Sequence, residues 1–372
     1  MSTVRAIVVV ITTLAACLGT SLVHADDDEK YPFYGLFRSR DLTTFGFLRL
    51  DMRPAYAVTI EPGTWAIETE LGYQNTWALS PEVEKYLISL EPTGRRKVGP
   101  DEVAAIQALP GENYLLDLES ANFDLTFHYK FAQNWTGYAI LSAISYNGGF
   151  LDSSIESFHD ALGFSTFGRP ALTKDSVRLI YDLKGAQVVS LGTPTDGGIA
   201  DPTFGIRYTG FAMPEKWAFS VEAAVKVPVD GERTLLSTGK TDFGLQASLQ
   251  RFWKRNALYL NVAGVYYAGS GYPIAQSSRV IPTLVLGYEY AFTQNTNVNL
   301  QGYVSRSVYT HEQTDLEELL GEKYQYTIGI RHRWNQFLVS FGFTENVQNI
   351  NNTPDIGLQL GLAWLPARKP RQ

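Results

Sequence analysis

The sequence predicts an all-β fold, a transmembrane antiparallel β-barrel of about 12 strands with short helices in its long extracellular loops. From Trp217 to Trp364 the chain repeats one unit, a stretch with an apolar residue at every second position followed by a turn. Successive side chains of a strand point to opposite faces, so each stretch has one apolar face and one polar or small face. The connections are alternately short and long. A barrel with lipid outside and a polar lumen inside has both features.

The composition favours strands as the membrane-spanning elements. Hydrophobic residues make up 45% of the 372 residues, yet the mean hydropathy is only −0.11. After residue 25 no apolar run reaches the length of a spanning helix. The 21 tyrosines suit the aromatic girdles of outer-membrane barrels. A net charge of −7 lacks the basic excess that nucleic-acid binding requires, so no nucleic-acid partner is expected.

Residues 1–25 predict a signal peptide of the Sec type, with a short basic start and an apolar core. Small residues favour cleavage after Ala25. An alternative is a lipoprotein box, in which Cys17 would carry lipid. Cys17 is the only cysteine, so disulfides and cysteine metal sites are excluded from the mature chain. Export together with a barrel predicts the outer membrane of a Gram-negative bacterium.

The stretch 26–64 fits no spanning strand, because Arg38, Arg40 and Arg53 interrupt it. We expect a periplasmic arm or a plug; an arm ordered on the inner rim of the barrel is the alternative. The barrel is expected to span 65–365 and to be followed by a basic tail, 366–372.

Within the barrel, strictly alternating short turns and long loops separate the predicted strands. If the short turns are periplasmic, both termini are periplasmic as well. The predicted strands are 65–78, 116–131, 134–147, 201–212, 216–227, 241–253, 256–268, 280–292, 296–308, 322–333, 336–347 and 355–365.

The period of two assigns side chains to the two faces of the wall. The lumen set carries both signs of charge, which indicates either a network that pairs across a narrow lumen or a selective polar pore. The predicted lipid-facing residues include Phe204, Ile206, Val221, Leu284, Leu286, Phe337, Val339 and Phe341. The predicted lumen-lining residues are Glu68, Glu70, Asp124, His128, Lys130, Arg207, Glu222, Lys226, Asp242, Asn299, Arg331 and Arg333.

The long loops predict helices near 81 and over 100–109 and 152–162, and a hairpin around 184–185 outside the wall. The third helix has an apolar stripe at helical spacing, which must be buried against something. We expect this helix to dock at the barrel mouth as a gate, with glycines as hinges at both ends. Burial in the lumen, or retention for a partner or lipid, is the alternative. The gate candidates are Leu151, Ile155, Phe158 and Leu162.

One cluster in the same helix is a candidate for acid–base chemistry, His159 with Glu156 and Asp160. Helical spacing brings His159 and Glu156 to neighbouring positions. A histidine among acids on an exposed helix is more often structural than catalytic. No zinc-ligand spacing is present, and the sequence predicts neither a metal site nor a cofactor.

Four stretches resemble the domain-of-unknown-function 3187 family of proteobacterial outer-membrane proteins. They are Gly149 to Gly163, Glu61 to Trp65, Gly198 to Pro202 and Asn352 to Leu358. The resemblance implies an outer-membrane barrel similar to channels, and it implies no catalytic residues.

The predicted function is therefore a small-solute channel or transporter with a loop helix near its mouth. Two alternatives stay open, a barrel enzyme that acts on outer-membrane lipid and a structural or partner-binding barrel. The expected partners are outer-membrane lipid and lipopolysaccharide, a small solute, and the barrel-assembly machinery during insertion.

Overall fold

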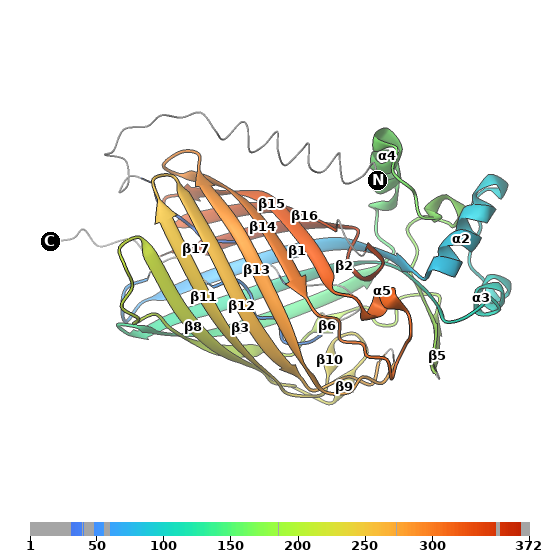
Figure 1. Ribbon diagram of the computed structural model, residues 1–372, viewed down its shortest axis with the longest axis horizontal. Coiled ribbons are helices and arrows are strands. Elements are labelled where there is room, and N and C mark those ends of the chain that lie inside the picture. The colour runs from blue at the N-terminus through green and yellow to red at the C-terminus, as the bar shows by residue number, and fades with distance from the viewer. Residues whose placement is uncertain are drawn as a thin grey trace.

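The computed structural model describes residues 31–38, 40, 48–55, 60–184, 186–272, 274–346 and 350–365. The predicted leader, with Cys17 and Ala25, and the predicted tail lie outside the described residues. Twelve antiparallel strands form a closed barrel (Figure 1), in which β1 pairs with both β2 and β17. The predicted fold class and strand number are thus confirmed.

The strands of the wall are close to the predicted ranges, and β7 is the shortest of them. In chain order they are β1 (Trp65–Leu79), β2 (Asn113–Ala132), β3 (Trp135–Asn147), β7 (Thr203–Tyr208), β8 (Trp217–Lys226), β11 (Asp242–Trp253), β12 (Asn256–Tyr267), β13 (Arg279–Ala291), β14 (Thr296–Ser305), β15 (Lys323–Trp334), β16 (Phe337–Glu345) and β17 (Ile356–Trp364).

The outer face of the wall is apolar, as the period of two requires. In β13, Leu284 and Leu286 are exposed, whereas Thr283 and Val285, which alternate with them, are buried. Phe204, Ile206, Val221, Phe337, Val339 and Phe341 are exposed on the same face. An apolar outer surface of this kind suits the hydrocarbon region of a bilayer.

Among the described residues, no helix is both long enough and apolar enough to cross a membrane.

The two ends of the barrel differ. Short turns such as 254–255 and 335–336 close one end, which we call the short-turn end. Longer connections gather at the other, the long-loop end, where they carry β6 (Gly198–Ile199), β9 (Glu232–Arg233), β10 (Ser237–Thr238), α5 (Glu317–Leu320) and η3 (Ile350–Asn352).

Two of the long loops build a lobe on the outside of the barrel at the long-loop end, which we call the outer lobe (Figure 1). It contains α2 (Pro81–Leu90), η1 (Glu91–Thr93), α3 (Pro100–Gln107), α4 (Asp152–Leu162) and η2 (Arg169–Ala171). β4 (Arg178–Leu183) pairs with the first residues of β2 and with β5 (Ala186–Ser190), so the predicted hairpin does lie outside the wall. Pro81 and Pro100 occupy the first turns of their helices, where a missing N–H costs nothing.

Apolar side chains pack on both faces of the β1–β2–β4 extension. On its outer face Leu79 and Leu115 form a small core with Leu87 of α2 and Ile106 of α3. On its inner face a second group, the mouth cluster, joins residues of β2 and β3 to residues of β12, β13 and three long loops. Since β2 and β13 lie opposite one another in the ring, this cluster spans the mouth. It includes Tyr114, Leu116, Tyr146, Tyr181, Leu235, Leu236, Tyr267, Ile274, Ile281, Tyr309 and Leu319.

Candidate functional site

The lumen of the barrel contains the chain's own N-terminal stretch, residues 31–38, 40, 48–55 and 60, which we call the lumen segment. Near the short-turn end, Glu289 of β13 accepts hydrogen bonds from the backbone N–H groups of Tyr34 (2.8 Å) and Gly35 (2.9 Å). Asn299 donates to the Gly35 carbonyl at 2.6 Å, and Arg331 donates to the Tyr34 carbonyl at 2.7 Å. Side chains of the wall thus provide hydrogen-bond partners for backbone groups of the lumen segment, which pairs with no strand over its described residues.

Halfway along the lumen, arginines of the lumen segment neutralise acids of the wall. Arg38 pairs with Glu68 at 2.8 Å, and Arg53 pairs with Asp124 at 2.8 Å. Arg40 lies 3.8 Å from the same Asp124 carboxylate. Both acids are buried, so each needs a cation within the barrel. Arg38, Arg40 and Arg53, whose charges interrupt the strand pattern of this stretch, therefore act as the counter-ions of the acids in the lumen.

Near the long-loop end, Asp242 of β11 holds residues 48–55 of the lumen segment in place. It accepts the N–H of Leu50 at 2.8 Å and pairs with Lys226 at 2.9 Å. Lys226 in turn donates to the Leu48 carbonyl at 2.6 Å. Leu48 packs against the mouth cluster, so the lumen segment is in contact with the side chains that span the mouth.

The remaining predicted lumen residues have different places. Arg207 and Glu222 pair within the wall at 2.6 Å. His128 is fully buried, 4.0 Å from Glu68. Lys130 is only half-buried, near the short-turn end of β2, and Arg333 donates to the Asn335 carbonyl at a turn. These last two lie at the rim rather than along the lumen.

Apolar wall positions also hold the lumen segment, and the sequence analysis missed them. Leu50 and Met52 pack on Ala263 and Val265, and Leu36 packs on Tyr259 and Val285. Two lumen-facing glycines provide the space: a Cβ at Gly287 would lie 2.3 Å from a Leu36 methyl, and one at Gly244 would lie 2.5 Å from the Met52 sulfur. The signal was present, because the lumen-facing positions of β12 are mostly small or apolar rather than charged.

Beside the lumen segment, two cavities follow the wall formed by β14–β17 and β1. The larger comprises about 610 Å³ including space open to solvent, and the smaller about 400 Å³. Glu70 and Gln359 line both, so the cavities adjoin. Around the larger cavity, Gln74 Nε2, Asn122 Oδ1 and Gln359 Oε1 have no hydrogen-bond partner among the described residues. The lining is mostly polar: Arg40, Asp51, Gln301, Tyr303, Gln325, Thr327 and Thr344 also contribute.

The expected gate helix does not lie over the lumen. α4 spans the predicted residues, but it packs outside the wall, where Asp152 accepts hydrogen bonds from Asn75 of β1 (3.3 Å) and from Arg169 (2.8 Å). Leu151 and Ile155 are buried, whereas Phe158 is 44% exposed and Leu162 is 54% exposed. The mouth cluster, not this stripe, spans the barrel mouth.

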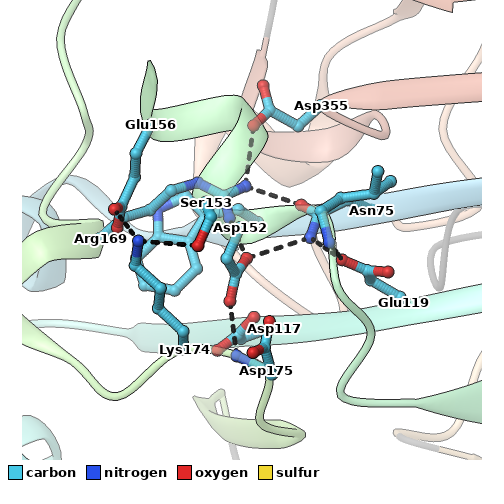
Figure 2. Close-up of polar contacts among 12 residues, drawn as sticks. Asn75, Asp117, Glu119, Asp152, Ser153, Glu156, Arg169, Lys174, Asp175 and Asp355 are labelled. Atoms are coloured by element: carbon cyan, nitrogen blue, oxygen red, sulfur yellow. Dashed lines mark hydrogen bonds and ion pairs between the residues drawn. The ribbon is translucent and has the colours of Figure 1, made fainter. Parts of the chain in front are cut away.

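A buried polar network attaches the outer lobe to the wall (Figure 2). Arg169 lies at its centre and donates to Asp152, to Asn75 (2.7 Å) and to Asp355 beside β17 (2.7 Å). Its guanidinium also stacks over the ring of Trp77, 4.8 Å from the centroid. One side chain therefore joins η2, α4 and two wall strands.

Glu119 of β2 fixes the start of α4. Its carboxylate accepts the N–H groups of Phe150 (3.0 Å) and Leu151 (2.8 Å). Gly149 has φ +79°, and a Cβ there would lie 1.7 Å from the Glu119 carboxyl carbon. Gly149 is thus a position of close packing, not the hinge that the sequence analysis expected.

The three residues of the candidate acid–base cluster make separate contacts and do not bond to one another among the described contacts. Burial raises the pKa of the Glu156 carboxyl, but hydrogen bonds from Arg95 and Lys174 outweigh burial and hold this pKa below its usual value. His159 Nδ1 lies 2.7 Å from the Ser165 carbonyl oxygen, so this nitrogen is a donor. Asp160 is exposed. Glu156 serves two cations and His159 serves a carbonyl, an arrangement that suits structural roles.

Several solved barrels are similar to this chain. An outer membrane channel from Pseudomonas putida F1 is 9% identical, with 84% of this chain and 99% of that chain covered and a TM-score of 0.49. The P. putida toluene transporter TodX is 9% identical, with 83% and 92% covered and a TM-score of 0.37. The translocator domain of the autotransporter NalP from Neisseria meningitidis is 10% identical, with 82% and 89% covered and a TM-score of 0.37. Similarity at this level assigns no solute to the present chain.

No curated protein matches the chain. A family model described as "Protein of unknown function (DUF3187)" matches residues 89–364, well over half of the sequence. This match covers the outer lobe except for most of α2, and it covers all barrel strands except β1. The chain therefore belongs to the DUF3187 family.

Proposed function

We propose that the protein is an outer-membrane channel for a small solute, and that its lumen segment keeps the channel closed at rest. The observation that carries the proposal is the pair of adjoining cavities between the lumen segment and the β14–β17–β1 wall, the larger of which is lined by many polar side chains. A barrel that served only as a rigid support could fill this space with side chains. The apolar outer face and the predicted leader support export to the outer membrane, with lipid and lipopolysaccharide around the wall and insertion by the barrel-assembly machinery.

The closed state has two barriers. The first is the lumen segment itself, because Leu36 and Met52 pack against the opposite wall and narrow the lumen. Above it the mouth cluster spans the opening. Because Leu48 contacts that cluster and Arg53 pairs with a wall acid, a shift of the lumen segment would widen the cavities and disturb the mouth together.

Removal of one cation of the lumen segment tests the proposal. The Arg53–Asp124 pair exists only while the segment is seated, so Arg53→Ala weakens the closed state and leaves an open state unaffected. Truncating one partner of a buried pair costs about 3–5 kcal/mol. We expect the ratio of open to closed time in planar bilayers to rise roughly a hundredfold or more, since each 1.4 kcal/mol is about a factor of ten.

Arg333→Ala is the matched control, because the Arg333 side chain donates to a turn carbonyl at the rim and, among the described residues, does not hold the lumen segment. It should conduct as the unsubstituted protein does. Silence of all three proteins, with heat-modifiable gel migration showing intact barrels, would contradict a channel function.

A further inference from the structure

α4 is attached to the outer lobe by one face and leaves two flanks free. The buried face consists of Asp152, Ile155, Glu156 and His159. Residues advance by about 100° along a helix. Phe158 and Leu162 therefore lie on one flank of the buried face, and Ser153 and Asp160 lie on the other. The helix is thus apolar on one exposed flank and polar on the opposite one.

Further exposed aromatic side chains lie at both ends of this helix. Phe164 lies 6.3 Å from Phe158, ring centroid to centroid, in an edge-on arrangement. Phe150, which is 65% exposed, precedes the helix and stacks on Tyr73 of β1 at 5.1 Å. Water-exposed apolar surface of this size is unfavourable and indicates an interaction site.

This group continues the lipid-facing surface of the barrel. Tyr73 stands two residues from Leu71 on the same face of β1. Leu71 pairs with Phe123 of β2 and with Leu360 of β17, and all three are exposed. Exposed apolar side chains therefore extend from the wall through Tyr73 to Phe150, the second residue before α4. In Figure 1, α4 lies across the direction of the strands at the long-loop end and extends beyond the outline of the barrel.

We propose that the Phe158–Leu162 flank of α4, with Phe150 and Phe164, inserts into the outer leaflet of the membrane beside the barrel. An amphipathic helix that lies in the interface buries its apolar side at the boundary of headgroups and acyl chains. The wall fixes the height of the helix through Glu119, Asn75 and Arg169, so the flank meets lipid once the barrel is in a bilayer. The polar flank, with Ser153 and Asp160, then faces the medium.

Site-specific fluorescence in vesicles tests this orientation. A Cys17→Ser background contains no native cysteine, so one engineered cysteine carries one environment-sensitive label. The test positions are Phe158→Cys and Leu162→Cys, both exposed and hence tolerant of substitution. Asp160→Cys is the matched control on the opposite flank of the same helix, and Leu71→Cys on the lipid-facing wall is the positive control.

In vesicles of phosphatidylethanolamine and phosphatidylglycerol with spin-labelled acyl chains, labels at 158 and 162 should be quenched to the same extent as a label at 71. A label at 160 should instead be quenched by aqueous iodide. If the labels at 158 and 162 respond to iodide as the label at 160 does, the flank faces water or awaits a protein partner, and the proposal is wrong. The readout is independent of conductance, so it stands or fails separately from the channel.

Discussion

At the scale of single residues, the facing of each wall position decides what a substitution costs. Leu286 lies near the middle of β13 and is 57% exposed on the lipid-facing surface. An arginine there would have to enter the hydrocarbon region, at a cost of about 2–4 kcal/mol. We therefore expect Leu286→Arg to lower the free energy of unfolding by this amount in a denaturant titration in liposomes.

Gln294→Arg is the control for that substitution, because Gln294 is exposed in the turn between β13 and β14 and meets water at the short-turn end. It should change the free energy by less than about 0.5 kcal/mol. Equal costs at the two positions would mean that β13 is shifted in register by one residue.

The period of two predicted which side of the wall each side chain faces, but it did not predict which groups each side chain contacts. The pattern places Asn299 in the lumen, where an arginine would be expected to be tolerated. The structure corrects this expectation, since the Asn299 amide donates to the Gly35 carbonyl and its side chain is fully buried. Periodicity carries no information about a contact between residues 264 positions apart.

At the scale of elements, the outer lobe depends on one buried cation. Arg169 satisfies Asp152, Asn75 and Asp355 at once, and Arg169→Ala would leave the buried Asp152 and the partly buried Asp355 carboxylates without this partner. We expect a loss of about 3–5 kcal/mol in the attachment of the lobe. Limited proteolysis should then cut the loop 148–200 much faster, while heat-modifiable migration of the barrel persists.

Lys184→Ala is the comparison, because Lys184 forms an exposed pair with Asp315 at 2.7 Å. Exposed pairs contribute roughly 0–1 kcal/mol, so its cleavage rate should stay close to that of the unsubstituted protein. An unchanged rate in Arg169→Ala would show that apolar packing alone holds the lobe.

The boundaries of α4 followed from its sequence, but its orientation did not. Gly163 in the left-handed conformation ends the helix where predicted. The apolar stripe was expected to be buried, yet Asp152 and Glu156 are buried and Phe158 is exposed. Cations outside the helix, Arg169 above all, reverse the usual preference of the helix faces, and a helical periodicity says nothing about cations outside the helix.

At the scale of the whole molecule, a closed wall of twelve strands encloses a segment of the same chain. The alternation of strands and turns was sufficient to predict the wall. The path of the lumen segment was not predictable, because it forms no regular strand among its described residues and is held by side chains of many strands. In the proposed channel, this segment must move before a solute can pass.

Cross-linking the lumen segment to the wall tests that claim most directly. The Cβ position at Gly244 lies 2.9 Å from the Cγ of Met52, close to the roughly 3 Å that separates Cβ and the partner sulfur in a disulfide. A protein with Met52→Cys and Gly244→Cys should therefore be locked closed when oxidised. We predict that its single-channel conductance is absent under oxidising conditions and returns on addition of dithiothreitol, while each single variant ignores the oxidant. The same conductance before and after reduction, including none in either state, would contradict the account.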